Sequence, residues 1–116
     1  IIVPYVENQN ELATYYSMAD LTVITSLRET FSLVCAESLS CGTPVVGFFA
    51  GGPETIAIDE YSEFVHWGNS KELKNVVEKW LDKKINKYTI SQIASQKYSQ
   101  NKMNLAYFDL YKKMVL

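Results

Sequence analysis

Glu37 is the residue of this sequence best suited to chemistry, because it is the single charged residue between Thr30 and Cys41. The residues around it are apolar or small, and a second carboxylate, Glu29, lies eight positions upstream. A carboxylate in an apolar helix is costly unless other groups satisfy its oxygens. No cation lies three or four positions away along the chain, so an ion pair within a helix does not explain Glu37. We expect a ligand to satisfy the carboxylate; the alternative is that Glu37 points to solvent between two helices.

Two strand-like runs flank the segment that carries Glu37. Residues 21–25 are rich in β-branched side chains and predict a strand covered on both faces, and residues 45–49 predict a second buried strand. The segment between them predicts a helix that ends at Gly42, with Pro44 preventing its continuation. A helical crossover of this length makes the two strands parallel. The predicted fold class is therefore α/β, with a Rossmann-like parallel sheet flanked by helices.

Further helices and strands are predicted on both sides of this unit. They are a strand over residues 1–6; a helix capped by Asn8 or Asn10 with Leu12, Tyr15, Tyr16 and Ala19 on one face; a short helix that begins at Pro53; a third strand over 62–67; a helix after the capping pair Asn69 and Glu72 with an apolar stripe of Leu73, Val76, Val77, Trp80 and Leu81; a helix over 88–98; and a last helix over about 102–115. At 116 residues, the chain has the size of one domain.

In an open parallel sheet, ligands bind beyond the carboxyl ends of the strands, so the loops over residues 26–32 and 50–54 are the candidate binding loops. The first loop leads into a helix N-terminus, which favours a phosphate by up to about 2 kcal/mol. From Phe31, where that helix should begin, Glu37 lies about 9 Å along the axis. A carboxylate accepts two hydrogen bonds side by side, which suits a ribose diol. Glu37 is therefore a candidate ribose ligand for a bound nucleoside diphosphate.

Each of the other candidate residues has a structural alternative. Glu29 can form an ordinary ion pair in the loop with its neighbour Arg28. Glu54 lies where any helix favours an acid in its first turn, and Gly51 and Gly52 can serve a tight turn alone. His66 is more often a packed residue than a base in such a strand-like run.

Composition excludes several classes of protein. The net charge of −2, from 11 basic and 13 acidic residues, argues against nucleic-acid binding. The cluster of Lys83, Lys84 and Lys87 falls where a helix should end, as the helix dipole favours. The two cysteines lack zinc-site spacing and predict an intracellular protein, and no run is long enough for a membrane helix. The first residue is Ile1 rather than Met, which predicts a piece of a longer polypeptide.

The segment from Ser26 to Val46 has a distinctive order of residues. It contains two glutamates separated by seven residues, then the turn Cys-Gly-Thr-Pro-Val, and it is followed by Gly-Gly-Pro-Glu at 51–54. Together with the run from Tyr15 to Ser26, this order resembles the signature of family-4 retaining glycosyltransferases. The resemblance covers roughly the first 80 residues, which is most of a small domain.

The resemblance implies a GT-B architecture, in which two Rossmann-like halves face one cleft and the C-terminal half binds a nucleotide-sugar donor. Residues 1–116 would be most of that C-terminal half, truncated at its N-terminal side. The helix over about 102–115 would then pack on the missing N-terminal domain.

The resemblance also implies roles for individual residues. The position of Glu37 holds the ribose hydroxyls, and that of Glu29, the implied catalytic residue, reaches the donor sugar. The other implied donor-binding residues are Arg28, Thr30, Phe31, Ser32, Leu33, Val34, Gly51, Gly52 and Glu54. Within this set, the amides from Phe31 to Val34 receive the diphosphate. Thr30 and Ser32 depart from the glycines that the family commonly has at these positions.

The activity implied by the resemblance is transfer of a sugar from a nucleoside diphosphate sugar, with retention and without a metal or other cofactor. The acceptor, such as a polysaccharide or a lipid-linked glycan, would bind through the missing domain, in the cytoplasm or at the inner face of a membrane. That domain and some basic residues of the donor half are absent from this sequence. We therefore expect the chain by itself to bind the donor weakly and to turn nothing over.

Three alternatives of the same architecture remain open. One is a nucleotide-sugar epimerase, and another is a phosphorylase, which needs a lysine that carries a cofactor. No lysine occurs between Ile1 and Gly68. The third is a partner subunit without catalytic activity; the two glutamates favour an enzyme, because a scaffold gains little from a lone carboxylate on an apolar helix.

Overall fold

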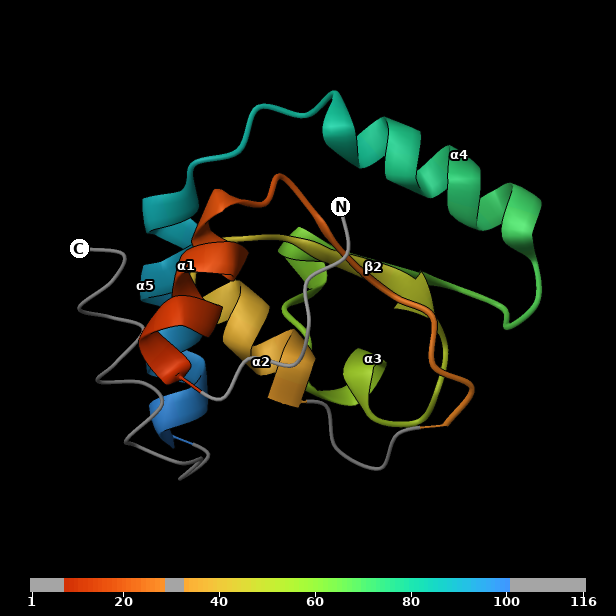
Figure 1. Cartoon of the computed structure of the whole chain (residues 1–116). Helices are drawn as coiled ribbons and strands as arrows, with labels where there is room; N and C mark the ends of the chain where they lie inside the picture. Colours follow the sequence, from red (N-terminus) through yellow and green to blue (C-terminus); the bar gives the residue numbers. More distant parts are fainter. Residues whose placement is uncertain (1–7, 29–32, 101–116) are drawn as a thin grey trace.

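The β-branched runs form a parallel sheet, as predicted. A computed structural model describes residues 8–28 and 33–100 (Figure 1). The three strands are β1 (Thr22–Ile24), β2 (Val45–Phe48) and β3 (Ser62–Val65), and they lie in the order β1–β2–β3. The helix α2 (Leu33–Ser40) connects β1 to β2, and all described strand pairs are parallel. The α/β fold class with a parallel sheet flanked by helices is confirmed.

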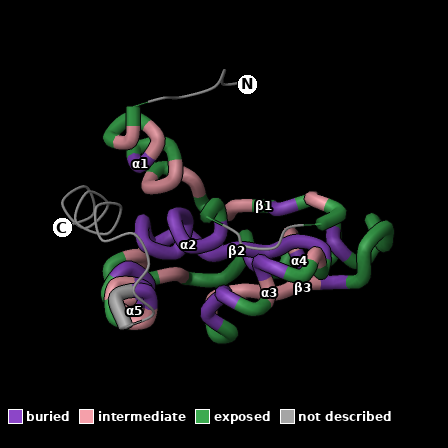
Figure 2. The backbone as a smooth tube through the Cα atoms, turned by 90° about the horizontal axis from the view of Figure 1, so that it is seen from below, coloured by how far each residue is buried: buried purple, intermediate pink, exposed green. Residues whose placement is uncertain are grey.

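Helices cover both faces of this sheet, because side chains alternate across β2. Val45 belongs to the core that α2 shares with α5 (Lys87–Gln100), whereas Val46 packs with α4 (Ser70–Leu81). The buried colour in Figure 2 accordingly runs through both α2 and β2, which lie at the centre of the fold.

The first strand differs from its prediction in length and in burial. It spans Thr22–Ile24 rather than residues 21–25, and the side chain of Val23 is 43% exposed. The expectation of cover on both faces is therefore wrong for β1. The physical reason is that β1 lies at one edge of the described sheet, while α4 packs mainly on β2 and β3.

Capping residues begin two helices as the sequence predicts. Asn8 accepts hydrogen bonds at Oδ1 from the backbone N of Asn10 at 2.8 Å and begins α1 (Gln9–Met18). Asn69 accepts from the backbone N of Glu72 at 3.0 Å and begins α4. The predicted apolar stripe of α4 is buried at Leu73, Val76 and Trp80, whereas Leu81 is 53% exposed and lies outside it.

The remaining helices are short or belong to the C-terminal part of the described chain. Pro53 begins α3 (Pro53–Ile56), as predicted, and a 3₁₀ helix (Asp59–Tyr61) leads into β3. The third strand ends at Val65, two residues before its predicted end. The predicted helix over 88–98 is confirmed as part of α5, which begins at Lys87.

Lys87 does not belong to the end of a helix, so the dipole interpretation is wrong for this residue. It begins α5, and its Nζ donates hydrogen bonds to the carbonyl of Ala19 and, at 2.9 Å, to Oγ1 of Thr43. Lys83 follows α4 as predicted, and its ammonium lies 3.6 Å from the ring centroid of Trp80. Tertiary contacts rather than the helix dipole account for Lys87.

Several predictions fall on residues that the structure does not describe. They are the strand over 1–6, the helix over about 102–115 and the loop residues 29–32. Among the helices within residues 8–28 and 33–100, none has the length and apolar character needed to cross a lipid bilayer.

Candidate functional site

The segments that follow β1 and β2 leave the sheet at the same end, because the two strands are parallel and their carboxyl ends lie side by side (Figure 1). The first comprises residues 25–28, and the second leads from Phe49 to Glu54 at the start of α3. Residues 25–28 and the segment from Phe49 to Glu54 therefore lie at the same end of the sheet. Four of the candidate residues, Glu29, Thr30, Phe31 and Ser32, lie outside the described part of the chain.

Glu37 lies in the middle of α2 and is 7% exposed. The alternative in which this carboxylate points to solvent is therefore wrong. Its helix is buried from Cys35 to Ser40 because α1 and α5 pack against it. A carboxylate in such surroundings requires hydrogen-bond donors or a neighbouring positive charge.

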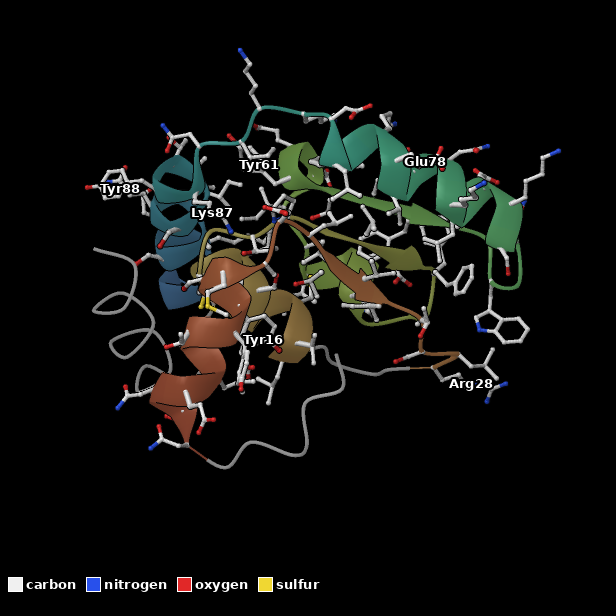
Figure 3. The ribbon with its side chains drawn as sticks, turned by 45° about the horizontal axis from the view of Figure 1, so that its top comes forward. Tyr16, Arg28, Tyr61, Glu78, Lys87 and Tyr88 are labelled. Atoms are coloured by element: carbon white, nitrogen blue, oxygen red, sulfur yellow. The ribbon has the colours of Figure 1, made fainter. Side chains whose placement is uncertain are left out.

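Tyr16 of α1 lies close enough to Glu37 for the charge of that carboxylate to act on the tyrosine hydroxyl. Figure 3 shows Tyr16 between α1 and the neighbouring α2. Burial raises the pKa of Tyr16 well above its ordinary value, and the negative charge of Glu37 raises it further. The helical spacing placed Tyr16 on a packing face, but it did not indicate that this face would lie next to Glu37.

The thiol of Cys41 also lies near this carboxylate. Burial raises the pKa of Cys41 to about 12, the Ser17 hydroxyl and the charge of Lys87 oppose that rise, and the charge of Glu37 adds to it. Cys41 is 1% exposed. A protonated, enclosed thiol is a packing group rather than a nucleophile, so Cys41 serves the structure of the site.

The start of α2 is open to solvent in the described residues. Leu33 and Val34 are 42% and 39% exposed. Arg28, the last described residue before the undescribed positions 29–32, is exposed (Figure 3). The rise of a helix places Glu37 about 6 Å along the axis from Leu33. The buried carboxylate therefore lies one turn from an accessible helix start.

Glu54 turns back onto its own loop. Its carboxylate accepts hydrogen bonds from the backbone N of Ala50, at 3.1 Å, and of Gly51. Burial by itself would raise the pKa of Glu54, but the backbone N–H groups of Ala50, Glu54 and Gly51 outweigh it and hold that pKa below its ordinary value. Gly51 has a φ of 99°, which favours glycine. These contacts support the structural alternatives for Glu54 and Gly51.

Two buried contacts attach the loop that Glu54 shapes to the rest of the fold. The hydroxyl of Tyr98 donates to the carbonyl of Ile56 at 2.9 Å, and Sγ of Cys35 donates to the carbonyl of Pro53 at 3.7 Å. The first contact joins α5 to α3, and the second joins α2 to α3. The loop over residues 50–54 is therefore fixed relative to the helix that carries Glu37.

His66 is the single histidine of the sequence, and it is exposed just after the end of β3. Its ring centroid is 5.8 Å from that of Phe49, so it belongs to a group of aromatic residues at the end of the sheet. Within residues 8–28 and 33–100, no three His, Cys, Asp or Glu side chains gather in a way that could hold a metal ion.

Comparison with known proteins identifies the family. The chain matches the sequence model of the family described as glycosyl transferases group 1 over residues 1–101. It belongs to that family. The family predicted from the spacing of Glu29, Glu37 and the Gly-Gly-Pro-Glu segment is confirmed, and the α/β structure is consistent with part of a GT-B domain.

The curated relatives of this glycosyltransferase-family chain are much longer than the chain. It is 48% identical over 54 residues to the D-inositol 3-phosphate glycosyltransferase of Streptosporangium roseum, a match that covers 47% of the chain and 12% of that protein. It is 42% identical over 60 residues to the protein of the same name from Xylanimonas cellulosilytica, with 52% of the chain and 14% of the relative covered. It is 53% identical over 47 residues to the protein of the same name from Thermobispora bispora, a match that covers 40% of the chain and 11% of that relative. The chain thus aligns with about an eighth of their length.

Proposed function

We propose that this chain is the donor-binding portion of a retaining glycosyltransferase that transfers a sugar from a nucleoside diphosphate sugar to an acceptor. The observation that carries the proposal is the burial of Glu37 within α2. This carboxylate lies one turn from the accessible start of α2, beyond the carboxyl ends of the parallel strands, where ligands bind to such sheets. Membership of the glycosyltransferase family supports the same conclusion.

The donor would lie along the first turns of α2. The helix start, with Leu33 and Val34, favours the diphosphate through its free N–H groups and its dipole, and Arg28 is the cation nearest in sequence. The ribose hydroxyls would then reach the carboxylate of Glu37 deeper along the helix. Thr30, Phe31 and Ser32 complete the diphosphate loop in this proposal.

The donor sugar would lie between the two loops. Glu29 would steady its hydroxyls or the positive charge that develops at the anomeric carbon, and the loop of Gly51, Gly52 and Glu54 would bound the other side. The bond between the anomeric carbon and the leaving phosphate oxygen breaks, and a bond from that carbon to the acceptor oxygen forms on the same face. The proton of the acceptor hydroxyl passes to the leaving phosphate. No metal ion or other cofactor enters this sequence of steps.

The acceptor would be a hydroxyl of a polysaccharide or lipid-linked glycan. It would bind to an N-terminal domain of a longer polypeptide, located in the cytoplasm or at the inner face of a membrane. In the family's architecture, a helix over about 102–115 would pack on that domain.

Calorimetric titration of uridine and guanosine diphosphates into the complete polypeptide that carries this chain tests the proposal. We expect one of them to bind, and Glu37→Gln to weaken that binding by about tenfold or more, since a hydrogen bond to a charged group contributes about 1.5–3 kcal/mol. A 2′,3′-dideoxy analogue should bind the parent and the variant alike. Glu60→Gln, at an exposed carboxylate, is the matched control. Equal binding of the ribonucleotide by the parent and Glu37→Gln would remove the proposed ribose contact.

A further inference from the structure

Phe49 is an exposed aromatic residue at the carboxyl end of β2, on the face of the sheet that α2 and α3 cover. Its backbone N still donates to the carbonyl of Val65 at 2.9 Å, so the pairing with β3 continues to this residue. The preceding residue, Phe48, packs in the core shared with α4, and alternation along the strand directs Phe49 to the opposite face. In Figure 1, α2 and α3 lie on one side of β2, and α4 lies on the other. Phe49 is therefore on the same side of the sheet as the helix that carries Glu37.

Two neighbouring rings support the ring of Phe49. The centroid of Phe64 lies 6.1 Å away with the ring planes tilted by 39°, and that of His66 lies 5.8 Å away with a tilt of 50°. These separations and tilts are typical of favourable contacts between aromatic rings. Phe64 in turn packs against the core that α2 and α3 share. Phe49 is nevertheless 45% exposed, so the described chain holds this ring from the side of the sheet and leaves much of it open to a ligand.

The segments around this ring are almost without charge. Apart from His66, neither residues 47–53 nor residues 64–69 contain an acidic or basic side chain. Glu54, in the adjoining loop, accepts hydrogen bonds from the backbone N of Ala50 and of Gly51. Such a surface does not attract a charged group such as a phosphate. It suits a neutral pyranose ring, whose C–H face can pack on an aromatic ring while its hydroxyls remain free to bond elsewhere.

Phe49 also adjoins the loop that the proposed function places beside the donor sugar. That loop, over residues 50–54, follows Phe49 directly. Gly51 and Gly52 have no side chains, so a ligand can approach the backbone closely at this point. The contact between Cys35 and Pro53 fixes the loop relative to α2. An aromatic ring thus lies next to a part of the site where a sugar has room to bind.

We propose that the exposed side of Phe49 packs against a pyranose ring during sugar transfer, with Phe64 and His66 holding the phenylalanine ring in place. The inference rests on the proposed function and names a residue outside the Gly-Gly-Pro-Glu segment. The pyranose ring comes either from the donor sugar or from the acceptor glycan. Both sources present the same C–H face to the ring, and two experiments on the complete polypeptide distinguish them.

Calorimetric titration with uridine diphosphate glucose, guanosine diphosphate mannose and the two free diphosphates tests the donor as the source. For the nucleotide that binds the parent, Phe49→Leu should raise the dissociation constant of the nucleotide sugar about three- to tenfold and leave that of the free diphosphate unchanged. Phe49→Tyr keeps the ring and should bind like the parent. Trp67→Leu is the matched control, because Trp67 is 55% exposed but its ring contacts Phe48 on the opposite face. It should change neither constant.

Saturation-transfer NMR tests the acceptor as the source. The probes are methyl α-D-glucopyranoside and methyl α-D-mannopyranoside, added to the complete polypeptide with the diphosphate bound. Saturation of the aromatic protons of the protein should pass to the C–H protons of a glycoside in the parent and in Phe49→Tyr. In Phe49→Leu the transferred signal should fall by about threefold or more. Trp67→Leu should again behave like the parent.

An effect of Phe49→Leu on the nucleotide sugar assigns the ring to the donor, and an effect on a glycoside assigns it to the acceptor; either supports the inference. It is overturned if Phe49→Leu weakens neither ligand, or if the parent binds the diphosphate but none of these sugars adds to that binding. Equal losses in Trp67→Leu would also overturn it. So would an equal loss for the free diphosphate, because Phe49 would then support the fold or pack on another part of the polypeptide. The proposed function fails separately, through unchanged diphosphate binding by Glu37→Gln.

Discussion

Lys87 donates a hydrogen bond from Nζ to Oγ1 of Thr43 at 2.9 Å, although the two residues lie 44 positions apart in the sequence. The same ammonium also donates to the carbonyl of Ala19 at the end of α1. These contacts join α5, the turn after α2 and the end of α1 at one point. Contacts between distant parts of the chain therefore contribute to its stability, and the predictions below concern Lys87, Gly42, Tyr98 and Cys41.

Replacing Lys87 with methionine should lower the free energy of unfolding by about 1–3 kcal/mol, because a carbonyl and a buried hydroxyl lose a charged donor. Methionine keeps much of the length and apolar character of the lysine side chain. Urea denaturation of the chain measures the effect, with Lys84→Met as the control at an exposed lysine. Equal losses in the two variants would show that the buried contacts of Lys87 contribute nothing to stability.

Gly42→Ala should destabilise the chain more than Gly68→Ala. Both glycines have a left-handed backbone, with φ of 86° and 87°, which costs an alanine about 1–2 kcal/mol. A Cβ on Gly42 would also lie 2.5 Å from the carbonyl oxygen of Lys87, whereas a Cβ on Gly68 would meet nothing within 4 Å. Denaturation of both variants isolates the cost of the close approach between α2 and α5. The prediction is wrong if the two alanines cost the same.

Tyr98→Phe should lower the free energy of unfolding by about 1–2 kcal/mol, because the carbonyl of Ile56 loses its buried donor. The loss should also loosen α3, so amide hydrogen exchange at residues 53–56 should accelerate relative to that in α4. Tyr88→Phe removes a hydroxyl from an exposed tyrosine of the same helix and should have little effect. Unchanged exchange in α3 would argue against an anchoring role for Tyr98.

The stability of the chain should fall as the pH rises above 9, in part because of Cys41. Its pKa is raised from 9.0 to about 12 in the folded state, so the folded protein retains a proton that the unfolded chain releases. The stabilising contribution is complete below pH 9 and is lost as the pH rises toward 12. The slope cannot exceed about 1.4 kcal/mol per pH unit for one group.

Urea denaturation at pH 8, 9 and 10 tests this dependence on the thiol. We expect Cys41→Ala to be less stable than the parent at pH 8, through lost packing, but to show a shallower decline between pH 9 and 10. Measuring no higher than pH 10 limits the contribution of the tyrosines, whose ordinary pKa is 10.0. Identical slopes for parent and variant would assign the decline to other groups.

Much of the local structure could be predicted from the sequence because its causes are local. The caps at Asn8 and Asn69, the helix end at Gly42 and the start of α3 at Pro53 depend on residues within a few positions of one another. The parallel pairing of β1 with β2 follows from the short helical crossover between them. The spacing of Glu37 within the family segment likewise required no structure to read.

The surroundings of Glu37 were decided by tertiary packing. The sequence showed that this carboxylate lies among apolar residues, but it did not show that α1, the helix that precedes β1 in the chain, would bring Tyr16 close to it. Tertiary packing also decided the role of Lys87, which local rules assigned to a helix end but which joins α5 to Ala19 and Thr43. It likewise decided the exposure of Val23, because its strand is an outer strand of the described sheet. Propensity and spacing act between residues near one another in the chain, whereas a buried polar group takes whichever partner the packing of distant helices brings within hydrogen-bond distance.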